Sequence, residues 1–98
     1  MKMNIEKKDK ELLIKLEGKL DTNTSADLDA KMSELDGMEK VVIDMEKLDY
    51  ISSAGLRVLL SMQKIMNKQG KMTLKNVCEN VMDIFEVTGF SEILNIED

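Results

Sequence analysis

The feature that most constrains the fold is a change of hydrophobic period in the middle of the chain. Val41-Val42-Ile43 is a continuous β-branched run, which is typical of a strand buried on both faces of a sheet beside a parallel neighbour. From Leu56 the apolar residues recur at helical spacing up to Met66, and Gly70 is a stop signal for that helix. A buried strand followed by a helix indicates an α/β domain.

The same two periods recur on either side of this unit. Alternating apolar and polar residues over 3–6 and 12–17 predict two strands, joined as a hairpin by the polar turn at 8–10 and ending at Gly18. A helix is expected between the capping residue types of 22–25 and Gly37, because Leu28, Met32 and Leu35 have helical spacing. We expect a strand at 72–77, a helix at 80–88 and a short edge strand at 93–96. The predicted fold is a mixed β-sheet with an N-terminal hairpin and helices packed on the sheet.

Length and composition limit the class of protein. The 98 residues fit one domain, 1–98. Apolar runs are too short to span a bilayer and the first residues are not a signal peptide, so we expect no direct membrane insertion. A single cysteine, Cys78, suits a reducing cytoplasm. A net charge of −5 and three aromatic residues argue against a nucleic-acid partner.

Catalytic motifs are missing from the sequence. Histidine is absent, which removes the usual base for a serine or cysteine nucleophile and the commonest transition-metal ligand. Neither a P-loop nor a GxGxxG turn is present, and no acidic cluster has EF-hand spacing. We therefore expect no enzyme activity, no catalytic residue, no metal and no cofactor. The nine methionines fit flexible core filling.

Two serines follow the predicted strand. Ser52 and Ser53 precede the small residues Ala54 and Gly55, at the carboxyl end of the sheet, where α/β folds place functional loops. The N-terminus of the next helix favours an anion, so the loop is a candidate phosphate-bearing site that a partner approaches over Ala54 and Gly55. The alternative is that serine only caps the helix and Gly55 is only a packing contact.

Charge is distributed unevenly along the chain. Residues 50–78 contain five bases and no acid, whereas residues 79–98 contain six acids and no base. A basic segment between acidic ones is a candidate partner surface. For Lys64 and Lys68 we favour a simpler explanation, their place near a helix C-terminus, whereas Arg57 stays open between the two explanations.

Three segments carry a family resemblance. Residues 48–56, Leu-Asp-Tyr-Ile-Ser-Ser-Ala-Gly-Leu, resemble the signature loop of the STAS domain of bacterial anti-sigma-factor antagonists. Residues 18–21, Gly-Lys-Leu-Asp, are similar to the family's Gly-x-Leu-Asp turn, and residues 85–90 to its late helix with a glycine stop. The register of Gly55-Leu56 puts the family's phosphorylated serine on Ser53. Ser52 stands where the family has aspartate and is the alternative.

The resemblance implies a phosphorylation-controlled partner switch. The unphosphorylated form would bind an anti-sigma factor, a serine kinase of the histidine-kinase-like ATPase fold, and free the sigma factor. ATP and magnesium would belong to that kinase, and a phosphatase would reset the switch. Asp21 would lie beside Ser53, and the partner surface would comprise Asp21, Ser52, Ser53, Ala54, Gly55 and Arg57. Two alternatives are a STAS scaffold subunit of a lipid or anion transporter and a small anion- or nucleotide-binding module.

Overall fold

Strands and helices alternate along the chain after an initial pair of strands. The computed structural model describes residues 1–97. Its strands are β1 (Lys2–Lys8), β2 (Glu11–Leu20), β3 (Lys40–Ile51) and β4 (Lys71–Lys75). Its helices are α1 (Ser25–Asp29), α2 (Ser53–Gln69) and α3 (Glu79–Thr88), with 3₁₀ turns η1 (Met32–Leu35) and η2 (Phe90–Glu92).

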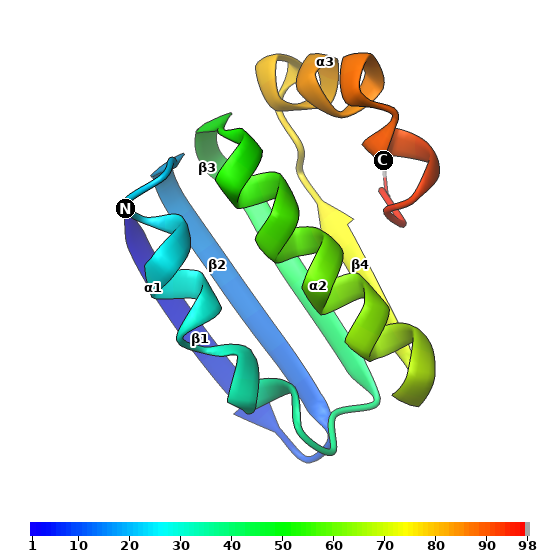
Figure 1. Cartoon of the computed structure of the whole chain (residues 1–98). Helices are drawn as coiled ribbons and strands as arrows, with labels where there is room; N and C mark the ends of the chain where they lie inside the picture. Colours follow the sequence, from blue (N-terminus) through cyan, green and yellow to red (C-terminus); the bar gives the residue numbers. More distant parts are fainter. Residues whose placement is uncertain (98) are drawn as a thin grey trace.

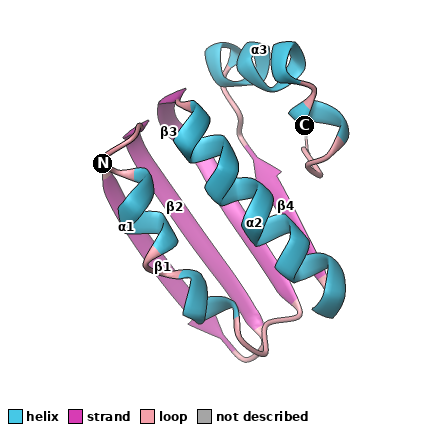
Figure 2. Ribbon diagram, viewed as in Figure 1, coloured by secondary structure: helices cyan, strands magenta, loops and turns pink. Residues whose placement is uncertain are grey.

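The four strands form one mixed sheet in the order β1-β2-β3-β4 (Figures 1 and 2). β1 and β2 are an antiparallel hairpin, whereas β2 pairs with β3, and β3 with β4, in parallel. Both parallel connections contain helical segments, as such crossovers require. The predicted mixed sheet with an N-terminal hairpin is therefore confirmed.

Within residues 1–97, helices cover only one face of the sheet. α1 and α2 lie on the same side of it (Figure 1). In β2 the alternate residues Leu12, Ile14 and Leu16 are buried, whereas no residue of the edge strand β1 is more than half-buried. In β3, Val41 and Ile43 are fully buried, whereas Val42 between them is only half-buried. The expectation that this run is buried on both faces was wrong, because no helix among residues 1–97 packs over the side to which Val42 points. All nine methionines are buried or half-buried, as core filling predicts.

The prediction for residues 12–37 needs correction in two places. β2 does not end at Gly18; it continues to Leu20, with irregular register on both sides of the glycine, whose φ is +103°. The helix expected before Gly37 is broken into α1 and η1. The Lys31 N–H donates to the carbonyl of Leu28, three residues earlier, and this 3₁₀-type hydrogen bond tightens the chain there. Leu28 and Leu35 are nevertheless buried in the core.

The C-terminal part also departs from the prediction in two places. β4 ends at Lys75, because Asn76 adopts a left-handed conformation with φ +58°, so Val77 lies outside the strand. α3 ends as expected at Gly89, whose φ is +83°. The edge strand expected at 93–96 is reduced to a single parallel bridge between Ile96 and Leu74.

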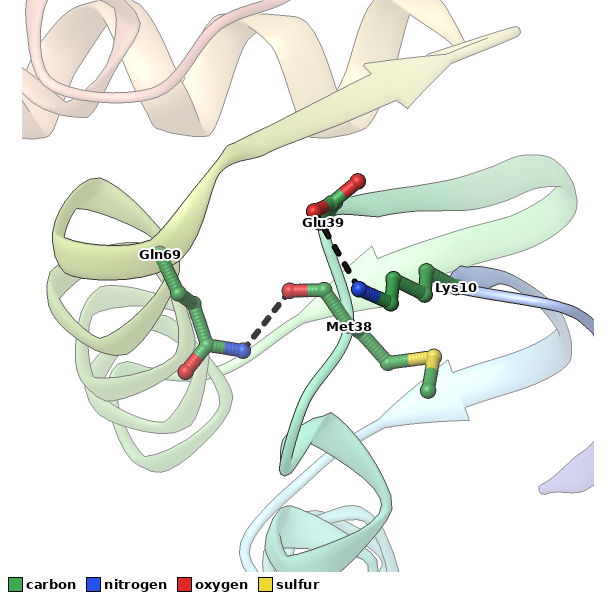
Figure 3. A network of polar contacts seen from close by, with 4 residues as sticks. All are labelled: Lys10, Met38, Glu39 and Gln69. Carbon is green, nitrogen blue, oxygen red and sulfur yellow. Dashed lines mark hydrogen bonds and ion pairs between the residues drawn. The ribbon is translucent and has the colours of Figure 1, made fainter.

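A polar network fastens the far end of α2 to the start of β3 (Figure 3). Gln69 Nε2 donates hydrogen bonds to the carbonyls of Leu35 and Met38, at 2.5 and 2.9 Å. Lys10 Nζ lies 3.7 Å from Glu39 Oε1 in an exposed ion pair. The two hydrogen bonds from the Gln69 side chain carry more weight than the ion pair, because exposed pairs contribute about 0–1 kcal/mol. α2 is thereby anchored at its C-terminus, opposite the end that carries the two serines.

Candidate functional site

Ser52 links the end of β3 to the first turn of α2. Its backbone is extended, with φ −95° and ψ 173°, and its Oγ accepts a hydrogen bond from Gly55 N–H at 3.3 Å. Its own N–H donates to the carbonyl of Leu20 at 2.9 Å. Ser52 is therefore the N-cap of α2, the structural role considered for a serine here, and its half-buried side chain is already engaged.

Ser53 is the first residue of α2, and it is exposed. The free N–H groups and the positive dipole end of a helix lie at this position. A negative charge on Ser53 would thus meet a favourable backbone field, and its side chain would project to solvent. The two neighbouring serines differ in access: one caps the helix, and the other faces outward.

Gly55 is buried and holds α2 against the sheet. A Cβ at this position would lie 2.9 Å from the Leu20 carbonyl oxygen, 2.9 Å from Leu20 Cγ and 2.9 Å from Ile51 Cγ1. Such contacts are too short for any ordinary packing. Gly55 therefore acts as a packing contact, the alternative considered from the sequence, and Ala54 beside it is half-buried.

Asp21 forms a turn directly after β2, next to the segment that carries Ser52 and Ser53, called the serine loop below. The β2–β3 register pairs Leu20 with Ile51, which brings the ends of the two strands together. Asp21 Oδ1 accepts hydrogen bonds from the N–H groups of Thr24 and Asn23, at 2.9 and 3.0 Å. Hydrogen bonds from the backbone and then the hydroxyl of Thr24 hold the pKa of Asp21 below its ordinary value. The carboxylate thus stabilises the turn that follows β2. Within residues 1–97 it makes no hydrogen bond to Ser53.

Arg57 lies one turn along α2 from Ser53, and its side chain is exposed. It borders a shallow depression of about 270 Å³ between α1 and α2. The lining residues come from both helices and the turn before α1: Thr22, Ser25, Ala26, Asp29, Ala54, Arg57, Val58 and Ser61. Arg57 and Ala54 therefore lie on one surface, which continues from the serine loop towards α1.

Tyr50 is an exposed aromatic residue that was not among the site residues predicted from the sequence. It is the penultimate residue of β3, and 44% of its surface is accessible. Aromatic side chains are enriched at protein interfaces. The irregular register of β3 against β2 breaks the strict alternation before Tyr50, so its outward position could not be deduced from the period of two.

Two negative findings apply to residues 1–97. No group of three or more cysteine or acidic side chains there could hold a metal ion. No helix in that part of the chain has both the length and the apolar character to cross a membrane.

The family follows from the sequence comparison. The model of the STAS domain family matches residues 2–98, and the chain belongs to this family. The fold described above is its α/β architecture, so the resemblance predicted from the serine loop is confirmed at the level of family and fold.

Several of the similar proteins are named as anti-sigma factor antagonists. BtrV of Bordetella bronchiseptica, a proposed anti-sigma factor antagonist, is 36% identical over 98% of this chain and 85% of its own. The anti-sigma-B factor antagonist of Staphylococcus aureus is 26% identical over 100% and 95% of the two chains. The unphosphorylated form of the anti-sigma factor antagonist SpoIIAA superposes with a TM-score of 0.77 at 19% identity, over 99% of this chain and 88% of its own. Phosphorylated SpoIIAA of Bacillus gives 0.76 at 19% identity, over 99% and 92%.

Proposed function

We propose that this protein is an anti-sigma-factor antagonist whose partner binding is controlled by phosphorylation of Ser53. The observation that carries the proposal is the division of roles between the two serines. Ser52 is engaged as the helix cap, whereas Ser53 is exposed at the first position of α2. The family membership and the named function of the relatives support the same role.

The proposed cycle needs a kinase and a phosphatase. The unphosphorylated protein binds an anti-sigma factor that is a serine kinase of the histidine-kinase-like ATPase fold, and the sigma factor is released. ATP and magnesium belong to that kinase. Phosphorylation of Ser53 ends the association, and the phosphatase restores the binding form. The chain itself acts as a cytoplasmic binding protein, not as an enzyme. Tyr50, Ala54 and Arg57 provide partner contacts, while Asp21, Ser52 and Gly55 hold the loop in place.

The switch rests on local electrostatics. A phosphoryl group adds about −1.5 to −2 charges at pH 7. Within the free protein this charge lies at a helix N-terminus and in water, so the fold tolerates it. In a close interface the same charge must lose its hydration, which costs several kcal/mol when the partner supplies no counter-charge. Phosphorylation therefore weakens the complex far more than the fold.

The modified residue can be identified by labelling. We expect the cognate kinase to label Ser52→Ala almost as well as wild type, and Ser53→Ala not at all. The kinase is first captured from the native cell with the purified protein and identified by mass spectrometry. Labelling that survives in Ser53→Ala and disappears in Ser52→Ala would move the site by one residue.

Ser53→Asp separates binding from stability. Acidic residues are favourable in the first turn of a helix, so the unfolding free energy should change by no more than about 1 kcal/mol. Affinity for the kinase should fall ten- to a hundredfold, since each 1.4 kcal/mol is about tenfold. Thermal melting and titration calorimetry on the same samples measure both. Unchanged affinity would reject charge at this loop as the switch and favour a scaffold role.

A further inference from the structure

We propose that Arg57 is the internal counter-charge for a phosphoryl group on Ser53. The inference rests on the proposed phosphorylation of Ser53 and concerns how the modified site is regulated. In the phosphorylated protein, the guanidinium of Arg57 pairs with the phosphoryl oxygens along the outer face of α2. The switch then has two parts: a dianion is added to the surface, and an exposed cation is withdrawn from it.

The register of α2 places the two residues together. Ser53 and Arg57 are separated by four residues in a continuous helix, and side chains at this spacing have Cβ atoms about 5–6 Å apart on one face. Both are exposed. The acid N-terminal to the base is the favourable order for such a pair, because each charge then suits the helix dipole.

α2 contains no acidic side chain with which Arg57 could pair. The exposed stripe that begins at Ser53 contains Arg57, Ser61, Lys64 and Lys68, and residues 53–69 include no aspartate or glutamate. Asp29 of α1 borders the same depression as Arg57. In the described part of the chain, however, the guanidinium makes no ion pair with it or with another carboxylate. Arg57 is therefore available to a new negative charge one turn away.

A phosphoryl group on Ser53 carries more charge on a longer side chain than the carboxylate of an aspartate at the same position, so it suits Arg57 better. Its oxygens can accept two parallel N–H bonds from the planar guanidinium, and such charge-assisted pairs are about twice as strong as neutral hydrogen bonds. The aspartate of Ser53→Asp has a shorter side chain than phosphoserine and carries a single charge. It therefore reproduces the added negative charge better than it reproduces the pairing with Arg57. A partner that recognises Arg57 in the unmodified protein would lose that contact on phosphorylation.

The test uses protein with phosphoserine incorporated at position 53 during translation, so it needs no kinase. Phosphorus NMR titration gives the second pKa of the phosphoserine, which is ordinarily about 6. We expect this pKa to be lower in the wild-type background than in Arg57→Gln by roughly 0.2–0.4 unit. Arg57→Lys should retain part of the shift. Lys64→Gln is the matched control, a neutralised base on the same stripe about 16 Å along the helix from Ser53.

The outcomes separate the pair from the wider field of the protein. Equal pKa values in wild type and Arg57→Gln overturn the proposal. A shift that Lys64→Gln reduces as much as Arg57→Gln also overturns it, because it then arises from net charge. A shift specific to Arg57 supports the pair even if no kinase modifies the protein, in which case only the proposed function fails.

Discussion

At the scale of single residues, the backbone conformation of Ser52 separates the roles of two adjacent serines. Its extended φ and ψ aim Oγ at the Gly55 N–H, and this leaves Ser53 as the first exposed helical residue. The sequence predicted that a serine caps α2 after the strand, but Ser53, Ala54 and Gly55, expected in a loop, belong to the first turn of the helix. It could not predict which serine is the cap from residue type, since two identical side chains stand side by side and only the dihedral angles distinguish them.

Because Ser52 is the N-cap of α2, alanine substitution of the two serines should change the unfolding free energy by different amounts. Ser52→Ala should lower the unfolding free energy by about 1 kcal/mol, the usual cost of losing an N-cap hydrogen bond. Ser53→Ala should change it by less than about 0.5 kcal/mol, because the side chain is exposed. Urea unfolding of the two variants measures both values. If Ser53→Ala costs more than Ser52→Ala, the assignment of the cap is wrong.

Asp21 predicts a pH dependence of stability at the same end of the fold. Its pKa is lowered from 3.8 by hydrogen bonds from Thr24, so folding favours the charged form. This contribution is fully present above pH 3.8 and is lost as the pH falls through the lower pKa of the folded state. The stability difference between wild type and Asp21→Asn should therefore shrink below pH 3.8. Carbon NMR should place the titration midpoint of Asp21 below 3.8, and a midpoint above that value would contradict the turn geometry.

At the scale of elements, two glycines set how closely α2 approaches the sheet. A Cβ on Gly55 would lie 2.9 Å from the Leu20 carbonyl, and one on Gly70 would lie 2.0 Å from the Glu39 carbonyl. These contacts sit at opposite ends of the helix. The sequence predicted α2 and its stop correctly, because its apolar spacing is regular over several turns. It predicted α1 less well, since three apolar residues over eight positions fit a broken helix as well as a continuous one.

Gly70→Ala should destabilise the protein by about 1–3 kcal/mol or more, because backbone opposes backbone and neither can move aside cheaply. The φ of Gly70 is 173°, which any residue adopts, so the cost is steric. Gly37→Ala is the control: a Cβ there meets nothing within 4 Å, but φ is +77°. Its cost should be about 1 kcal/mol and arise from backbone strain. Denaturant unfolding compares the two, and a smaller cost at Gly70 would show that this contact is not tight.

At the scale of the whole molecule, the fold has a covered face and an open face. The covered face holds the core and supports the serine loop through β2, β3 and α2. Sequence patterning predicted the four strands and the mixed sheet that they form, but it overestimated the burial of β3 and the extent of the pairing at 93–96. A short β-branched run suits a half-covered strand as well as a fully covered one, since Val42 contacts neighbouring strands even where no helix lies over it. The bases of residues 50–78 also divide between the two faces, because α2 and β4 belong to different layers.

The two-layer arrangement can be tested by substituting alanine separately at two neighbouring positions, Val41 and Val42. Val41 is fully buried under the helices, whereas Val42 is half-buried on the open face. Val41→Ala should cost about 2–3 kcal/mol, because it loses the burial of two methyl groups and leaves a cavity in the core. Val42→Ala should cost about 1 kcal/mol or less, because water and neighbouring side chains fill the vacated space. Urea unfolding of the isolated protein gives both values. Equal costs would contradict the two-layer arrangement, because Val42 would then be packed as tightly as Val41.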